Sequence, residues 1–258
     1  MALALTSQQP TAKRWQRSQV SILQKRENIS RKCMQRLIKH EALQMAMLQW
    51  LGSKRFLASL AFGGETMLRL CHELPRYSFG LEFSFFKEES YDGFYDRFYT
   101  ALSLNHDVID AQNRDHSIIV EVKRKRRTPK LKIEISKTTV SPGSTEEKIA
   151  FSPHFPIQVL VRGFTLQQML QNKILSLLAH GGIRDAFDVE FFLRKGVTLN
   201  LPEVEKKKVL KKLRGFKKRD FDMKLGGILQ PELRDYYRRK GFSYLEEKFS
   251  FEQWGNEG

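Results

Sequence analysis

Apolar and polar residues alternate strictly from position 77 to position 85. The apolar set is Tyr77, Phe79, Leu81, Phe83 and Phe85, and the residues between them are Ser78, Gly80, Glu82 and Ser84. A period of two is typical of a half-buried strand, so Glu82 is expected in the middle of its polar face. A Gly63-Gly64 turn and a short helix precede this strand. Backbone N–H groups at the start of that helix are suited to holding a phosphate.

The flanking segments predict further elements around this strand. A helical pattern extends over residues 30–52 with Ser30 as N-cap, and residues 54–62 read as a short strand or a helix end. An aromatic helix-like segment at 91–99 is expected to cover a sheet, and short strands are expected at 106–111, 117–123 and 131–136. Glu134 is then a single acid on the polar face of the last strand. Residues 138–157 contain Pro142, Gly143 and Ser144 and are predicted to be a loop next to a domain boundary.

The second half of the chain predicts helices. Thr165 and Gln168 form a capping box, and Lys173 falls on the apolar stripe of the helix that follows, where it needs an anion or a route to solvent. In the next helix, Arg184 and Asp188 have the spacing of an i,i+4 pair. An aromatic-rich closing helix is expected at 232–249. The expected class is α+β, with an extension at 1–29, a mixed sheet flanked by helices at 30–157 and a helical domain at 158–258.

Composition adds a strong positive charge to this picture. The 258 residues include 45 Lys and Arg against 29 Asp and Glu, a net charge of +16, which indicates a polyanionic partner. Aromatic residues make up 11%, so the chain is expected to be globular. Its two cysteines argue against a disulfide framework or a thiolate metal site. No apolar run is long enough to span a bilayer, so a cytoplasmic protein without a membrane partner is expected.

Three stretches concentrate the basic residues. Residues 1–40 hold nine of them against Glu27 alone, which fits an arm on RNA or on an acidic protein, an organelle transit peptide, or a solvated extension. The second is a hairpin tip made of Lys123, Arg124, Lys125, Arg126 and Arg127, for which nucleic-acid contact is favoured over plain solubility. The third is a basic amphipathic helix at 206–219, whose RNA-facing candidates are Lys207, Lys211 and Arg214. A solvated face and a membrane-surface helix are the alternatives there.

A set of these residues resembles the signature of the AbiEii-type nucleotidyltransferase toxins, which share a polymerase-beta-like palm. The matching positions are Gly63, Gly64, Thr66, Leu68, Arg69, Leu70, Arg76, Tyr77, Ser78, Leu81 and Phe83. Lys173 and the Arg184-Asp185-x-x-Asp188 segment fit the same family. The sequence departs from the pattern at Glu65, where a small residue is usual, and at Gly80 and Glu82, where the family has two aspartates.

The resemblance implies a nucleotide site and a metal site. It assigns nucleotide binding to Gly63, Gly64, Thr66, Arg69, Arg76, Ser78 and Lys173. Catalytic roles fall to Glu82, Glu134, Lys173 and Asp185. Mg²⁺ or Mn²⁺ would be held by Glu82 and Glu134, because such ions prefer carboxylate and phosphate oxygens. Lys173 would hold the phosphates of the NTP substrate, and Asp185 would orient Lys173 or act as the base for the attacking hydroxyl.

Two functions of different class remain open at this point. The first is a metal-dependent, toxin-like nucleotidyltransferase that modifies RNA, with the 3′ end of tRNA as the favoured acceptor, or a protein. The second is a catalytically impaired palm that binds RNA or a partner protein. The departures at Gly80 and Glu65 favour the second, unless Asp92, Asp96, Asp107 or Asp110 supplies the ligand missing at Gly80. The presence of Glu134, Lys173 and the Arg184-Asp185 pair favours the first. Family members often have a neutralising partner, which makes an acidic antitoxin plausible.

Overall fold

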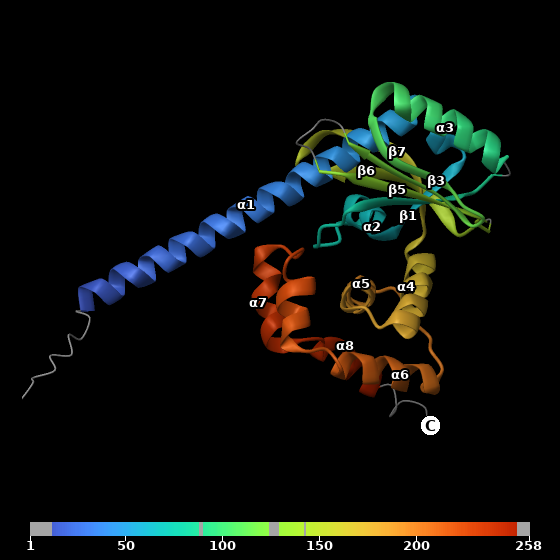
Figure 1. The fold of residues 1–258 in the computed structure, drawn as a ribbon. Coiled ribbons are helices and arrows are strands. Elements are labelled where there is room, and N and C mark those ends of the chain that lie inside the picture. Colours follow the sequence, from blue (N-terminus) through green and yellow to red (C-terminus); the bar gives the residue numbers. More distant parts are fainter. Residues whose placement is uncertain (1–11, 88–89, 124–128, 142, 252–258) are drawn as a thin grey trace, which may run out of the picture. The chain divides into compact units, whose positions relative to one another are not determined.

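The fold is known from a computed structural model that describes residues 12–87, 90–123, 129–141 and 143–251 (Figure 1). Internal contacts divide the chain into two units, residues 1–39 and 40–258. The described part of the first unit is entirely helical and belongs to α1 (Ala12–Ser53), which continues into the second unit. The helix therefore begins well before Ser30, the predicted N-cap.

A seven-stranded mixed sheet forms the centre of the second unit, with the strand order β3-β4-β5-β2-β1-β7-β6. The strands are β1 (Leu60–Gly63), β2 (Gly80–Phe85), β3 (Asp107–Asn113), β4 (Ser117–Lys123), β5 (Leu131–Thr139), β6 (Thr145–Ser152) and β7 (Phe155–Phe164). Strand β2 pairs antiparallel with β1 and parallel with β5, and β1 pairs parallel with β7. This sheet and its flanking helices confirm the predicted α+β class.

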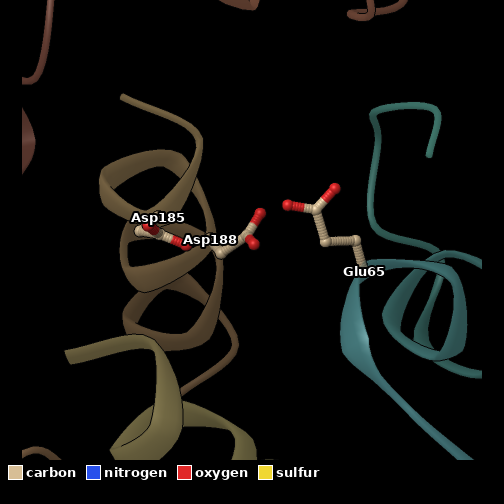
Figure 2. A group of neighbouring side chains, drawn as sticks. All are labelled: Glu65, Asp185 and Asp188. Carbon is tan, nitrogen blue, oxygen red and sulfur yellow. The ribbon is translucent and has the colours of Figure 1, made fainter. Parts of the chain in front are cut away.

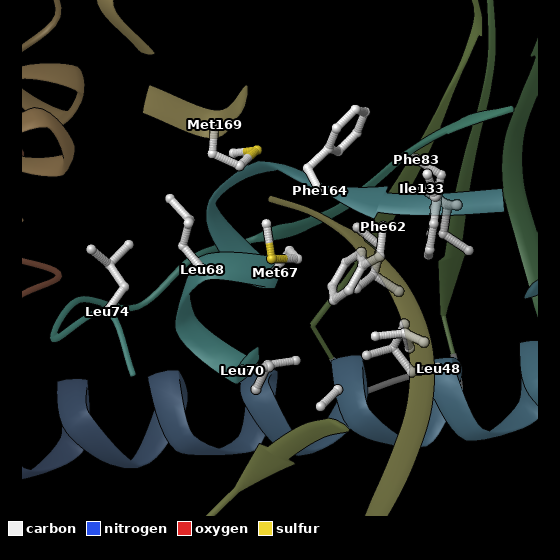
Figure 3. Packing of buried hydrophobic residues seen from close by; sticks show 14 of the residues in the cluster. Leu48, Phe62, Met67, Leu68, Leu70, Leu74, Phe83, Ile133, Phe164 and Met169 are labelled. Carbon is white, nitrogen blue, oxygen red and sulfur yellow. The ribbon is translucent and has the colours of Figure 1, made fainter. Parts of the chain in front are cut away.

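One face of the sheet is buried under helices and the other face remains open. Leu81, Phe83 and Phe85 of β2 are buried, whereas Glu82 between them is exposed, as the alternation predicts. The helices of the buried side are the end of α1, α2 (Gly64–His72) and α3 (Tyr91–Asn105). Phe94 of α3 contacts Phe85 edge to face, and Figure 3 shows Met67 of α2 and Leu48 of α1 among the buried side chains. This apolar packing is the main stabilising contribution to the fold.

Helices make up the rest of the second unit. They are α4 (Leu166–His180), α5 (Ile183–Arg194), α6 (Glu203–Arg214), α7 (Pro231–Lys240) and α8 (Ser243–Phe251), with a 3₁₀ turn η1 (Phe56–Ala58) before the sheet and a π-helical segment η2 (Asp220–Leu225) before α7. The Thr165 side chain accepts a hydrogen bond from the N–H of Gln168, so it caps α4 as predicted. The predicted closing helix at 232–249 is two helices, α7 and α8, which are separated at Gly241. In the described part of the chain, no helix has the length and apolar character needed to cross a membrane.

The prediction of a loop at 138–157 is wrong. Strands β6 and β7 occupy most of this segment and pair antiparallel, and Gly143 and Ser144 belong to the turn before them, whereas Pro142 lies outside the described residues. β6 lies at the edge of the sheet and leaves Ile149 and Phe151 exposed. Its pattern of buried positions is therefore not the pattern of its apolar residues, and hydrophobic periodicity could not reveal it. The domain boundaries themselves stay a prediction.

Candidate active site

The Gly63-Gly64 turn brings the start of α2 against the carboxylate of Glu82. Gly63 is aligned with Glu82 across the β1–β2 pair. Gly64 has a φ of +68°, and a Cβ atom there would lie within 2.8 Å of both carboxylate oxygens of Glu82. Glycine is thus required at position 64 for two reasons: its backbone conformation and the absence of a side chain next to Glu82. No side chain caps the helix at Gly63, so its first N–H groups stay available for an anion.

This close approach makes Gly64→Ala a sharp test of the turn. We expect a loss of both stability and catalysis, because the new methyl group must displace the Glu82 carboxylate. Gly196→Ala is the matched control, since Gly196 has a φ of +79° and no atom within 4 Å of its Cβ position. The control should lose only about 1 kcal/mol of stability from the left-handed conformation. Equal loss of activity per folded molecule in both variants would contradict the assigned contact.

Glu82 and Glu134 stand side by side on the open face of the sheet. They are aligned in the parallel β2–β5 register, and both line a pocket of about 310 Å³. Although part of the Glu82 side chain reaches solvent, the protein packed around its carboxyl group raises its pKa above the ordinary value, and the charges of Glu65 and Glu134 add to this effect. A divalent cation beside Glu82 would favour the charged form of its carboxyl group.

Helix α4 brings Lys173 to the same pocket. Its Nζ atom lies 3.0 Å from Asp188, 3.1 Å from Asp185 and 3.5 Å from Glu65. The other oxygen of Asp185 accepts a hydrogen bond from Ser176 at 2.9 Å. The position of Lys173 on an apolar stripe predicted that it needs an anion, and the structure places three carboxylates around it. Burial alone would lower its pKa, but Asp188, Glu65 and Asp185 raise it, so the ammonium group stays charged.

Arg76 is the fully buried centre of this ion network. Its Nε and Nη2 atoms donate to both oxygens of Asp188 at 2.7 Å, and Nη1 donates to Glu65 at 2.8 Å. Arg76 and Asp188 both have an exposed side-chain fraction of 0%. Although burial alone would raise the pKa of Glu65, Arg76 and then Lys173 lower it to about 2. Helix α2, the segment before β2 and helices α4 and α5 are thereby joined by charged hydrogen bonds.

Two groups of carboxylates are candidates for binding a divalent cation. They differ in whether cationic side chains already pair with them. Glu65, Asp185 and Asp188 bring carboxylate oxygens within 4.8 Å of one another, and Figure 2 shows Glu65 and Asp188 pointing toward each other. Arg76 and Lys173 already form ion pairs with all three of these carboxylates. Glu82 and Glu134 instead face the open pocket. Two hard oxygen ligands beside space for phosphate oxygens and water fit the coordination that Mg²⁺ or Mn²⁺ prefers.

The predicted nucleotide-binding residues fall into two groups. Gly63, Gly64 and Lys173 line the pocket. The others, Thr66, Ser78, Arg69 and Arg76, are buried and bound to protein groups.

Thr66 and Ser78 share a hydrogen bond of 2.6 Å, and Thr66 also donates to the carbonyl of Gly80. Arg69 binds Glu41 at 2.8 Å and lies 4.5 Å from the centre of the Tyr77 ring. These side chains support the turn and the strand from behind the pocket.

Two residues of the network were not assigned a role from sequence. Glu65 was noted only as a departure from a pattern, and Asp188 was expected to pair with Arg184 instead of Arg76 and Lys173. A signal for Asp188 was present, because it sits between Phe187 and Val189 in a helix that is apolar there. A carboxylate in such a position requires a buried cation. The acids considered as substitutes for Gly80, which are Asp92, Asp96, Asp107 and Asp110, do not line the pocket.

The structure describes only part of the predicted nucleic-acid contacts. Arg124, Lys125, Arg126 and Arg127 lie outside the described residues, and Lys123 ends β4. Lys207, Lys211 and Arg214 are exposed on α6 and line a surface hollow of about 370 Å³ together with Leu210 and Gly215.

The profile of the family described as "Nucleotidyl transferase AbiEii toxin, Type IV TA system" matches residues 48–254. Among curated proteins, none matches. Two similar solved structures are JHP933 from Helicobacter pylori, with 18% identity over 83% of this chain and 95% of that chain and a TM-score of 0.48, and the nucleotidyltransferase toxin MenT4 from Mycobacterium tuberculosis H37Rv, with 15% identity over 83% and 91% and a TM-score of 0.43.

The family profile spans the β1–α2 turn, the strand that bears Glu82, and the helices that bear Lys173 and Asp185. It confirms the resemblance drawn from the sequence. The chain therefore belongs to the AbiEii nucleotidyltransferase toxin family.

Proposed function

We propose that this protein transfers a nucleotide from an NTP to RNA, with the 3′ end of tRNA as the favoured acceptor, and that the reaction depends on Mg²⁺ or Mn²⁺. The observation that carries the proposal is the alignment of Glu82 with Glu134 in a pocket that also holds Lys173 and the Gly63-Gly64 turn. Carboxylates, a cation and free N–H groups are what an NTP and its metal ion require.

The roles follow from what each group contacts. Glu82 and Glu134 would hold the ion, which when bound neutralises the charge that develops on the phosphates. The N–H groups at the start of α2 would hold a phosphate oxygen. Lys173 would contact the phosphates from the opposite wall. Both oxygens of Asp185 already accept hydrogen bonds, from Lys173 and Ser176, which supports the role of orienting Lys173 over that of a base.

RNA is the proposed acceptor because of charge. A net charge of +16 and the exposed cations of α6 suit a polyanion. A protein acceptor is the second candidate. The type IV description of the family also supports a cognate antitoxin, which we propose to be acidic.

The decisive experiment incubates the purified protein with Mg²⁺ or Mn²⁺, each labelled NTP in turn and total tRNA. Lys173→Ala serves as the control. Label in tRNA that requires both Lys173 and the ion would support the proposal and name the nucleotide. Salt-sensitive tRNA binding without transfer would favour an RNA-binding palm instead. Gly80, which supplies no carboxylate beside Glu82, is the residue that keeps this alternative open.

The α6 surface gives a separate prediction. For tRNA binding, log K falls as log salt rises. Replacing Lys207, Lys211 and Arg214 by Gln should make this negative slope shallower by about 2, because each lost phosphate contact to a single strand removes about 0.7. The matched control replaces three cations of α7, Arg238, Arg239 and Lys240, by Gln. If the slope changed equally in both triple variants, or did not change in the α6 variant, the cations of α6 would be a solvated face and not an RNA contact.

A further inference from the structure

The β2–β5 register continues one step beyond the two pocket carboxylates. Two residues before Glu82 and Glu134, Gly80 is aligned with Lys132. Residues two apart on a strand share a face, so Lys132 lies on the open face beside Glu134. Gly80 offers no side chain there, and the space on its side of Lys132 stays open.

The Lys132 ammonium group is close to the pocket and accessible. Its Nζ atom lies 2.6 Å from Oε2 of Glu134, and the two side chains are 48% and 42% exposed. Glu134 is therefore a pocket carboxylate that is already paired with an exposed cation, in the one ion pair that the described part of the chain gives Lys132. Exposed ion pairs of this kind exchange partners at little energetic expense.

Lys173 differs from Lys132 in this respect. Its side chain is only 12% exposed, and it contacts three carboxylates, of Glu65, Asp185 and Asp188. Moving it fully onto a phosphate would take its charge from all three, and Asp185 would lose its ion pair while keeping the hydrogen bond from Ser176. The pocket walls and the network behind them already carry five carboxylates, and an NTP adds further negative charge. A cation that can leave its present partner is therefore needed at the mouth.

We propose that Lys132 binds a phosphate oxygen of the incoming NTP and, in doing so, releases Glu134 to the divalent ion. This inference rests on the proposed function. It makes binding of the NTP and binding of the ion mutually supportive, since the same ammonium group blocks Glu134 before the NTP arrives and contacts the triphosphate afterwards. The chain itself then supplies one of the charges at the triphosphate.

Lys132→Met should change the two affinities in opposite directions. Calorimetric titration with a non-hydrolysable NTP analogue in Mg²⁺ should show binding about tenfold weaker than in the wild type, the usual effect of losing one charged hydrogen bond. Titration with Mn²⁺ alone should show tighter binding, because Glu134 is free. Lys132→Arg should keep most of the NTP affinity.

Lys130→Met is the matched control. Lys130 lies two positions away, just before β5, is 54% exposed and pairs with Glu121 at 3.0 Å, so its replacement removes the same charge close by without touching Glu134. Both affinities should stay at the wild-type level in this variant. Unchanged NTP affinity in Lys132→Met, or an equal change in Lys130→Met, would overturn the inference while leaving the proposed function intact. Failure of the wild type to bind any NTP analogue would overturn both.

Discussion

Replacing Glu82 by Gln should reduce nucleotide transfer at least about 1,000-fold, the scale expected when a group that acts on the reacting phosphates is lost. Glu82 touches the Gly64 turn, faces the pocket and lies beside Glu134. The measurement is single-turnover label transfer at saturating ion, with circular dichroism as the check on folding. Glu121→Gln is the control, because Glu121 belongs to the same sheet face but pairs with Lys130. Retention of activity in Glu82→Gln would remove Glu82 from the site.

The same substitution should not destabilise the protein at neutral pH. Burial of the Glu82 carboxyl, with Glu65 and Glu134 nearby, raises its pKa in the folded state. A carboxyl group with a raised pKa favours folding while it is protonated, and this contribution is lost as pH rises through the folded-state pKa. The neutral amide avoids that loss. We therefore expect Glu82→Gln to unfold at an equal or higher urea concentration than the wild type at pH 7. A clearly lower midpoint would contradict the electrostatic assignment.

Replacing Arg76 by Ala should lower the free energy of unfolding by about 3–5 kcal/mol, because Asp188 is left charged and buried without its main partner. Both side chains have an exposed fraction of 0%. Urea denaturation would measure the change. Arg238→Ala is the control, since Arg238 contacts Asp222 at 2.6 Å on the surface, and its loss should leave stability unchanged within error. A small effect in Arg76→Ala would mean that the network does not hold α5 to the sheet domain.

A double variant separates stability from activity. Arg76→Met with Asp188→Leu removes both charges and fills their space with apolar groups, which often restores the stability lost by breaking a buried pair. Lys173 would then keep only Glu65 and Asp185 as partners. We expect a stable protein with impaired nucleotide transfer. Wild-type activity in this variant would mean that the network stabilises the fold without positioning Lys173.

The network also predicts an acid-sensitive contribution to stability. Arg76 and Lys173 lower the pKa of Glu65 to about 2 from an ordinary value of 4.5. A carboxyl group with a lowered pKa stabilises the fold fully above its unfolded-state pKa and loses this effect as pH falls through the folded-state pKa. Stability from Glu65 should therefore decline between about pH 5 and pH 2. In Glu65→Gln, urea denaturation across this range should show a weaker dependence on pH.

Hydrophobic alternation was informative wherever one face of an element meets the core. The strand at 77–85, the aromatic helix at 91–99 and the strand at 131–136 were predicted on this basis, and the structure has β2, α3 and β5 there. Burial of one face depends on residues that are close together in the sequence, so it can be recognised from the local pattern of apolar residues. Strand β6 shows the converse. It is an edge strand with exposed apolar residues, and its pairing with β7 replaces the local signal.

The candidate site divides in a similar way. Its open-face acids, Glu82 and Glu134, could be assigned from sequence, because alternation fixes the face on which each lies. Their alignment across β2 and β5 could not, since register depends on how two distant strands pair. Alternation places Lys132 on the same face as Glu134, but its alignment with Gly80 appears only once the sheet is assembled.

The sequence by itself determined the class of the fold, the polar face of the central strand, the Gly63-Gly64 turn and the placement of Lys173 where it needs an anion. These are consequences of periodicity, backbone freedom and desolvation, which act over a few residues. Only the tertiary structure decided which anions Lys173 meets, that Arg76 is committed to Asp188 and Glu65, and that Lys132 is aligned with Gly80. Partners more than a hundred residues apart, such as Arg76 and Asp188, are selected by the packing of whole elements, and no local pattern encodes that choice.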